Sequence, residues 1–229
     1  MTHRQPISIS PLRVFVSLLL MLCSLTAGAQ GILKLQRDSI PLFRGFALSF
    51  DLVGAAQKML SDHGQYEGAF RLNLHDQFFP IVEVGYGYAS HEDDEVTTIS
   101  YHTSAPYFRA GIDVNVMKKK HTGNRVYVGL RAAHTSYKVD VNAQSFIDPI
   151  WKRTTTYGIK DEPCSQTWAE FLFGIDAKVF GPLHLGWSAR YKMRLAHDDG
   201  LMGKTWYVPG YGMQDGSAMG VTFNVIIDI

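Results

Sequence analysis

Residues 180–195 read FGPLHLGWSARYKMRL, and the two faces of this stretch differ at every position. From Leu183 to Leu195 the odd-numbered residues are apolar or aromatic, and the even-numbered ones are His, Gly, Ser, Arg or Lys. A period of two over this length indicates a β-strand. A water-soluble barrel would point the apolar face inward, whereas a membrane barrel points it outward to lipid. Other parts of the sequence must decide between the two.

The N-terminal residues 1–29 have the pattern of a secretory signal peptide. Residues 1–13 are basic and contain no acid, and residues 14–26 (VFVSLLLMLCSLT) are apolar but too short to span a bilayer. Ala27-Gly28-Ala29 then provides an A-x-A cleavage site. We therefore predict that residues 1–29 are a cleaved signal peptide and that residues 30–229 form one exported domain.

The composition of the mature chain excludes several classes of protein. Once the signal peptide is removed, Cys164 is the one remaining cysteine, so no disulfide framework is expected. The formal net charge of the full 229-residue chain is only +1, which does not favour nucleic acid. The acidic run HEDDE at residues 91–95 lacks the spacing of a calcium loop, and no metal or cofactor is implied. No apolar run after residue 29 is long enough for a membrane helix, so any membrane role must use strands.

The mature chain consists of alternating runs separated by loops. We predict eight strands, with apolar sets that begin at Phe46, Tyr66, Val82, Phe108, Val126, Thr167, Leu183 and Met219. Short turns and long loops alternate between these strands. The long loops cover about residues 54–65, 89–105, 138–165 and 196–217. This pattern predicts an all-β fold, an eight-stranded antiparallel up-and-down barrel in a single domain.

The polar face of the strands has the composition of a narrow lumen. Glycines share it with charged residues, and small residues make room for long side chains in a confined cross-section. Buried charges must be paired, and the charges on this face nearly balance. The predicted lumen charge network consists of Asp51, Glu67, Glu83, Asp113, Glu170 and Asp176 with Arg71, Arg109, Arg131, Lys178, Arg190, Lys192 and Arg194.

The opposite face carries almost no charge and is rich in Trp, Tyr and Phe, which is typical of a lipid-exposed band. We therefore predict a transmembrane barrel in which Leu185 and Trp187 face lipid. For Arg190, the adjacent strand offers Glu170 and Asp176 as partners. The alternative is a soluble exported barrel that binds a ligand in a cavity lined by the aromatic residues.

Five stretches carry a family resemblance: RGFALSFDL, YEGAFRLNL, FFPIVEVGYGYA, PYFRAGIDVNV and YVPGYG. They resemble an uncharacterised group of small outer-membrane β-barrel proteins of the Bacteroidota type. The resemblance implies a location in the cell outer membrane, insertion by the barrel-assembly machinery, and contact with outer-membrane lipids and lipopolysaccharide. It implies no established activity.

An eight-stranded barrel has an interior that side chains just fill. We therefore expect a monomeric structural or surface-interaction protein that acts through its extracellular loops on an unknown partner. A narrow ion-conducting pore is an alternative. A general diffusion porin is disfavoured.

His134 and Ser136 form the one enzymatic pattern that we consider. A His and a Ser two residues apart on one strand face are neighbours, close enough for base-assisted nucleophilic attack. The pair resembles the outward His-x-Ser of lipid A deacylase barrels. Here Tyr137 follows in place of the family's usual Asn, and Asp148 is the candidate orienting acid. A lipid A-modifying enzyme is therefore an alternative function.

Overall fold

In a computed structural model of the chain, the described residues are mostly β-strand. They are residues 41–92, 99–143, 146–147, 154–155, 158–213 and 215–229. The predicted signal peptide at 1–29 lies outside the described residues.

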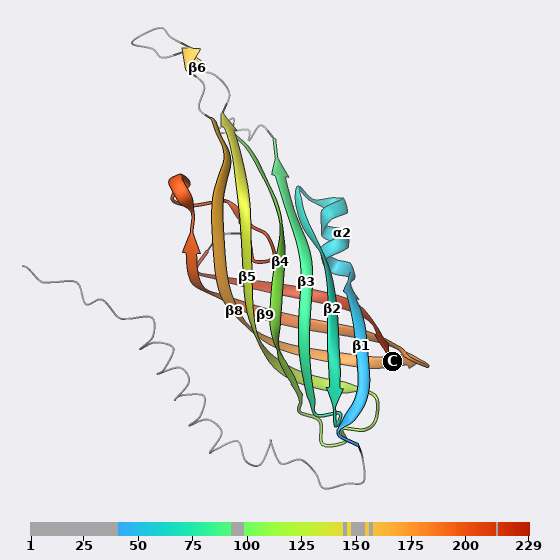
Figure 1. The fold of residues 1–229 in the computed structure, drawn as a ribbon. Coiled ribbons are helices and arrows are strands. Elements are labelled where there is room, and N and C mark those ends of the chain that lie inside the picture. The colour runs from blue at the N-terminus through green and yellow to red at the C-terminus, as the bar shows by residue number, and fades with distance from the viewer. Residues whose placement is uncertain (1–40, 93–98, 144–145, 148–153, 156–157, 214) are drawn as a thin grey trace, which may run out of the picture. The chain divides into compact units, whose positions relative to one another are not determined.

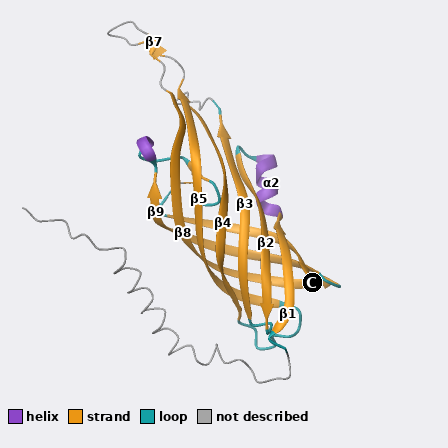
Figure 2. Ribbon diagram, viewed as in Figure 1, coloured by secondary structure: helices purple, strands orange, loops and turns teal. Residues whose placement is uncertain are grey.

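Eight antiparallel strands form the body of the fold (Figures 1 and 2). Each pairs with its neighbours along the chain, and β1 also pairs with β12, which closes the sheet into a barrel. The prediction of an eight-stranded antiparallel sheet is confirmed. The strands are β1 (Phe43–Asp51), β2 (His63–Leu74), β3 (Phe78–His91), β4 (Ile99–Asn115), β5 (Arg125–Ala143), β8 (Gly158–Phe180), β9 (Leu183–Asp198) and β12 (Ser217–Asp228).

The two ends of the barrel differ. The turns after β2, β4 and β8 lie at one end, which we call the turn end. The longer connections lie at the other end, which we call the loop end. These connections contain α2 (Leu52–Leu60), β6 (Phe146–Ile147), β7 (Thr154–Thr155), η1 (Gly200–Met202), β10 (Tyr207–Val208) and β11 (Gly212–Met213).

The predicted loop at 54–65 is wrong, because most of it belongs to helix α2. Asp51 provides the N-cap, and its carboxylate accepts the backbone N–H groups of Val53 and Gly54 at 3.1 Å each. Val53, Ala56 and Leu60 follow at helical spacing and form an apolar stripe. Among the described residues, no helix is long and apolar enough to cross a membrane.

Strands β4, β5 and β8 extend much farther toward the loop end than their sequence patterns predicted. The predicted loops at 89–105 and 138–165 are correspondingly too long, because β4 begins at Ile99, β5 continues to Ala143 and β8 begins at Gly158. The pairing of β5 with β8 is continuous from Arg125 opposite Asp176 to Val139 opposite Glu162. In Figure 1 these strands form a tall wall on one side of the barrel.

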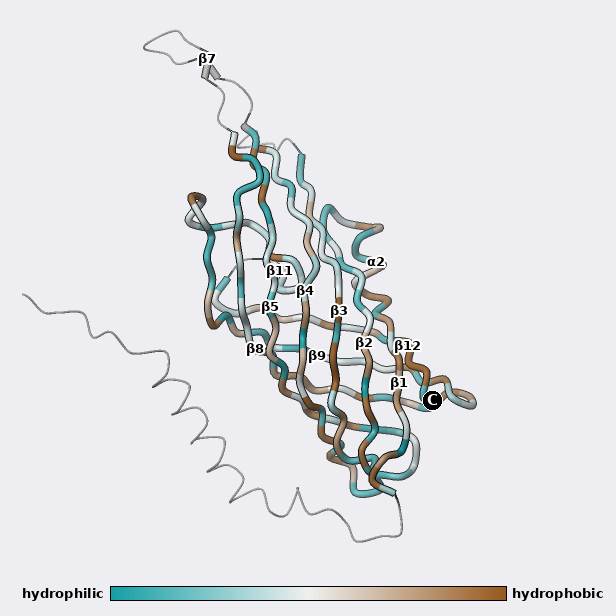
Figure 3. The backbone as a smooth tube through the Cα atoms, viewed as in Figure 1, coloured by the Kyte–Doolittle hydropathy of each residue, from teal (hydrophilic) through white to brown (hydrophobic). Residues whose placement is uncertain are grey.

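The two faces of β5 exchange polarity along the strand. Near the turn end, the inward residues include Arg125 and Arg131, while the outward residues from Val126 to Ala132 are apolar. Beyond Ala132, the buried residues are uncharged and, apart from Thr135, apolar or aromatic, and the outward ones are polar. Figure 3 shows brown apolar segments mainly in the lower half of the strands as drawn.

The predicted loop at 196–217 folds back into the loop end of the barrel instead of remaining outside it. We call residues 205–212, most of which are buried, the plug. Tyr207, Val208 and Tyr211 are all at most 3% exposed. The hydroxyl of Tyr101, on β4, donates to the carbonyl of Tyr207 at 2.9 Å.

The plug completes an apolar core at the loop end. This core contains Ala89, Tyr101, Ala105, Tyr107, Ala133, Tyr137, Val139, Val141, Cys164, Trp168, Tyr207, Val208 and Tyr211. Burial and the neighbouring carboxylates of Asp199, Glu162 and Asp198 raise the pKa of the Cys164 thiol to about 11. The thiol is therefore neutral near pH 7 and a poor nucleophile.

Candidate functional site in the barrel interior

Below the plug, the barrel interior is filled by paired charges. Many of the inward side chains are ionic although they are buried. The lumen charge network in the structure consists of Arg71, Arg109, Arg125, Arg131, Arg190 and Lys192 with Glu67, Glu83, Asp113, Glu170, Asp176 and Asp228. Within each strand, charged residues an even number of positions apart point into the same interior, because residues two apart share a face of the strand.

Glu83, on β3, is the centre of the network. Its carboxylate accepts hydrogen bonds from Arg109 at 3.2 Å, from Arg190 at 3.0 Å and from Arg131. All four side chains are at most 5% exposed. Three guanidinium groups around one carboxylate can be tolerated only because further carboxylates lie beside them.

Two of those carboxylates lie nearer the plug. Glu67 accepts from Arg109 and from the Tyr107 hydroxyl at 2.8 Å, and it lies 3.0 Å from Arg190. Glu170 lies 2.9 Å from Nε of Arg109 and accepts the indole N–H of Trp168 at 2.7 Å. The two acidic residues therefore share their arginines with Glu83.

The network continues toward the turn end through Arg71. Its guanidinium group lies 2.6 Å from Asp176 and 3.6 Å from Asp113. Asp113 is also 3.1 Å from Arg131, which links this part to Glu83. The ion pairs thus form a connected chain along the barrel axis.

Arg125 and Asp228 belong to the network, and sequence analysis missed both. Arg125 pairs with Asp228 and lies 3.9 Å from Asp176. Arg125 shares the inward parity of Tyr127 and Arg131, so extending β5 by one more residue pair would have found it.

Lys192 and Arg109 connect the network to the plug. The Lys192 ammonium donates to the carbonyl oxygens of Gly210 and Tyr211 at 2.8 and 3.0 Å. Arg109 donates to the same Gly210 carbonyl at 2.7 Å. Two buried cations therefore hold the tip of the plug. The carbonyl oxygens of Gly210 and Tyr211 accept hydrogen bonds from Lys192, and Gly210 also accepts one from Arg109, in addition to the acceptors that the carboxylates provide.

Inward glycines make room for large side chains, as expected, but aromatic side chains use part of that room. A Cβ at Gly85 would lie 2.1 Å from the Tyr107 ring, and one at Gly174 would lie 2.4 Å from the Tyr127 ring. A Cβ at Gly129 would meet the Asp113 carboxylate at 2.1 Å. The lumen is consequently well packed, and the cavity beside Glu83 and Arg190 measures only about 10 Å³.

Three residues of the predicted network have other positions. Asp51 is buried, but it caps α2 and accepts the N–H of Phe223 at 3.1 Å instead of pairing with an arginine. Lys178 is exposed and Arg194 is only half-buried. Irregular pairing of β8 with β9 next to Lys178 and between Thr167 and Trp168 interrupts the regular parity at both ends of β9.

Arg190 also has different main partners from those expected. Glu170, on the adjacent strand, lies 3.6 Å away, but Glu67 and Glu83 are closer at 3.0 Å each. Asp176 pairs with Arg71 instead. A long arginine side chain crosses the narrow barrel, so the opposite wall supplies partners as easily as the neighbouring strand.

A polar vestibule of about 360 Å³ opens at the turn end. Asp76 lies there between Arg44 at 3.3 Å and His121 at 2.7 Å. Burial opposes ionisation of Asp76, but hydrogen bonds from His121 and Asn73 outweigh it and lower the pKa of the carboxyl group. Exposed Lys178 also lines this vestibule.

His134 and Ser136 lie on the outward face of β5, where its polarity changes. Nε2 of His134 is 3.3 Å from the Ser136 hydroxyl, and Nδ1 is 2.9 Å from the Thr167 hydroxyl. The position that an acidic residue occupies in a catalytic triad is thus taken by the neutral hydroxyl of Thr167, and among the described residues no carboxylate contacts His134. A hydroxyl cannot stabilise an imidazolium as an acid does. Asp148, the candidate acid, lies outside the described residues.

The geometry gives no sign of a metal centre in the part of the chain that the structure describes. No group of three or more His, Cys, Asp or Glu side chains is placed there to hold an ion. Residues 93–95 of the HEDDE run lie outside the described residues.

Three solved structures are similar to the chain at low identity. Ail, the attachment invasion locus protein of Yersinia pestis, solved with the heparin analogue sucrose octasulfate, has 12% identity and a TM-score of 0.37, covering 80% of this chain and 93% of Ail. A major outer membrane protein from Thermus thermophilus has 10% identity and a TM-score of 0.43, covering 81% and 100%. CarO2 of Acinetobacter baumannii has 12% identity and a TM-score of 0.42, covering 83% and 100%.

No curated protein matches the chain. One family model matches residues 11–228, which include all eight barrel strands and the plug. The chain therefore belongs to the family described as a domain of unknown function, DUF6048.

Proposed function

We propose that the chain is an integral outer-membrane β-barrel with a closed interior. The exchange of polarity along β5 carries this proposal. Outward residues are apolar from Val126 to Ala132 and polar from His134 to Asn142, while the inward residues include Arg125 and Arg131 near the turn end and carry no charge from residue 133 to residue 141. A protein surrounded by water has no reason to exchange its faces partway along a strand. A protein that passes from lipid into water does.

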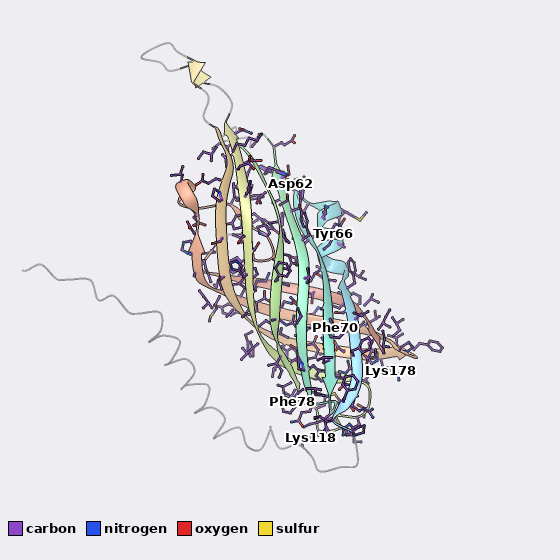
Figure 4. All side chains as sticks on the ribbon, in the orientation of Figure 1. Asp62, Tyr66, Phe70, Phe78, Lys118 and Lys178 are labelled. Carbon is purple, nitrogen blue, oxygen red and sulfur yellow. The ribbon has the colours of Figure 1, made fainter. Side chains whose placement is uncertain are left out.

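The height of the apolar surface supports the same proposal. On β8 the outward residues from Ala169 to Val179 are apolar, and Phe171, Phe173 and Ile175 are each at least 40% exposed. Ten steps of about 3.3 Å, on a strand tilted by about 40°, span roughly 25 Å. This equals the roughly 25 Å height of the lipid-facing band of outer-membrane barrels. Figure 4 shows Tyr66 and Phe70 along the wall on β2, between Asp62 at the loop end and Lys118 at the turn end.

In this proposal the turn end lies in the periplasm and the loop end lies outside the cell. The outer-membrane lipids and lipopolysaccharide surround the band, and the barrel-assembly machinery inserts the chain, which acts as a monomer. The tall wall of β4, β5 and β8 extends beyond the band with polar outward residues. Its surface, including Lys138 and Lys160, is the part that a partner outside the cell could reach. A structural or surface-interaction role therefore fits this architecture best.

Cysteine labelling tests the membrane topology with two matched lysines. In a Cys164→Ser background, we expect Lys160→Cys, near the loop end, to react with a membrane-impermeant maleimide on intact cells. We expect Lys119→Cys, in the turn after β4, to react only after the outer membrane is permeabilised. Both lysines are exposed in the structure, so access of the reagent determines the result. Labelling of Lys119→Cys on intact cells would reverse the orientation, and recovery of the protein in the soluble fraction would overturn the membrane proposal.

Planar-bilayer recording tests the closed interior. We expect no stepwise conductance from the purified protein, because the cavity of about 10 Å³ beside Glu83 has room for about one water at most. The plug and its contacts with Arg109 and Lys192 close the loop end as well. A known porin in the same bilayers is the positive control. Reproducible steps that depend on the amount of protein would instead favour the narrow-pore alternative.

A further inference from the structure

The barrel wall has a seam near the loop end where strand pairing stops. β1 pairs with β12 from Phe46 opposite Ile229 only as far as Asp51 opposite Asn224. β12 continues to Ser217 and pairs with β9 over this whole length. Among the described residues, Ser217–Phe223 therefore has no strand partner on the β1 side. β2 likewise extends to His63, although its pairing with β1 ends at Gly68.

Helix α2 lies in this seam, and Asp51 positions it. The Asp51 carboxylate caps the helix and also accepts the N–H of Phe223, the first β12 residue beyond the paired region. One side chain therefore ends β1, begins α2 and provides an acceptor for the edge of β12. Figure 1 shows the helix beside the loop ends of β1 and β2.

A groove of about 800 Å³ remains between α2 and β12. Val53, Ala56, Gln57 and Leu60 line one side, and their spacing of three and four residues places them on one face of the helix. Met219 and Val221 of β12 line the opposite side, and the plug residues Tyr207 and Tyr211 and the adjacent Met213 also contribute. The volume lies within the range of about 300–1,000 Å³ that is usual for sites of small ligands.

The lining of the groove is mixed: Gln57, His63, Gln65, Lys192 and Asp215 contribute polar groups, while its most exposed large side chains are apolar. Leu60 and Met219 are 87% and 86% exposed, and Met213 is 56% exposed. The edge of β12 adds backbone N–H and C=O groups that have no strand partner, and such groups are costly to leave unpaired next to hydrocarbon. The groove therefore suits a ligand with a long apolar chain and a polar linkage that can meet the edge of the strand.

We propose that the groove between α2 and β12 binds one acyl chain of lipid A, with the polar linkage of that chain at the edge of β12. This inference rests on the proposed membrane topology, which places the loop end in the outer leaflet. The groove is continuous with the lipid-facing band through Val221 and Phe223 of β12. A peptide strand could pair with the same edge, but the Met, Val and Leu side chains along the groove favour hydrocarbon over peptide.

Native mass spectrometry with two matched variants tests this site. Ala56→Trp fills the groove from the helix, and Met59→Trp places the same side chain on the same helix at a residue that does not line the groove. After reconstitution with equal amounts of lipid A and phospholipid and extraction in mild detergent, we expect one lipid A on the wild-type protein and on Met59→Trp. We expect occupancy of Ala56→Trp to be lower by about tenfold or more.

Equal lipid A occupancy of both variants, absence of bound lipid A, or retention of phospholipid or peptide in its place would each overturn the inference. Vesicle flotation of the same proteins separates this outcome from failure of the proposed function. Protein that floats with vesicles but retains no lipid A contradicts only the groove. Protein that does not float contradicts the membrane topology as well.

Discussion

Replacing Glu83 with alanine is expected to lower the free energy of unfolding by at least about 3–5 kcal/mol. The carboxylate accepts from Arg109, Arg131 and Arg190, and its loss leaves three buried guanidinium groups with too few acidic partners. Removal of one member of a buried ion pair costs this much because the remaining charge is uncompensated. Urea titration of the protein folded into phospholipid vesicles, followed by tryptophan fluorescence, measures the change.

Two further variants separate charge from packing at this position. Glu83→Gln keeps the size of the side chain but removes its charge, so we expect most of the destabilisation to persist. Lys138→Ala removes an exposed ion pair, in which the ammonium lies 3.2 Å from Asp161, and should cost less than about 1 kcal/mol. If Glu83→Gln unfolds within about 1 kcal/mol of the wild-type protein, the buried arginines do not depend on Glu83 for charge compensation.

Parity along the strands predicted most of the buried charges but few of their partners. A period of two is a local property, so the sequence alone shows that Glu83 and Arg190 point to the polar face. The partner of each residue depends on the width of the barrel. Arg190 contacts Glu67 and Glu83 across the interior, at sequence separations that no local pattern reveals. Asp51 has the predicted inward parity and is buried, yet its carboxylate accepts hydrogen bonds from backbone N–H groups of α2 and of β12 instead of pairing with an arginine.

The long ends of β4, β5 and β8 were missed for a different physical reason. Residues 137–142 of β5 alternate as regularly as the rest of the strand, but their apolar members are odd-numbered, whereas those between Val126 and Ala132 are even-numbered. A search for strands in which one face stays apolar throughout therefore stops near Ala132, where, in the proposed topology, β5 leaves the lipid. In the proposed topology this exchange of parity marks the membrane boundary, and it could be sought directly in the sequence.

The plug had no comparable local signal. Its residues TWYVPGYG contain turn-forming glycine and proline and several aromatics, which is compatible with an exposed loop or with a buried one. Its position depends on the contacts of the Gly210 carbonyl with Arg109, 101 residues away in the chain, and with Lys192. Such contacts exist only once the barrel has closed.

An arginine placed on the outward face of β8 should be strongly destabilising on the lipid side of the proposed membrane boundary and nearly neutral on the other side. Phe173 lies in the middle of the apolar stretch from Ala169 to Val179 and is 40% exposed. We expect Phe173→Arg to lower the free energy of unfolding from vesicles by about 2–4 kcal/mol, the cost of a charge near the midplane of the bilayer. Ser165 lies on the same face of the same strand, eight residues nearer the loop end, opposite Ser136 of β5.

Because Ser165 lies among polar outward residues, Ser165→Arg should change the free energy of unfolding by less than about 0.5 kcal/mol. The same urea titration serves for both variants. The difference between their free energies of unfolding locates the edge of the apolar band on β8, whatever the total stability of the protein. If both substitutions are tolerated, the apolar face of β8 does not contact lipid and the soluble barrel becomes the better proposal. If both are strongly destabilising, the hydrocarbon extends beyond Ser165, and the exchange of polarity on β5 has a cause other than the edge of the bilayer.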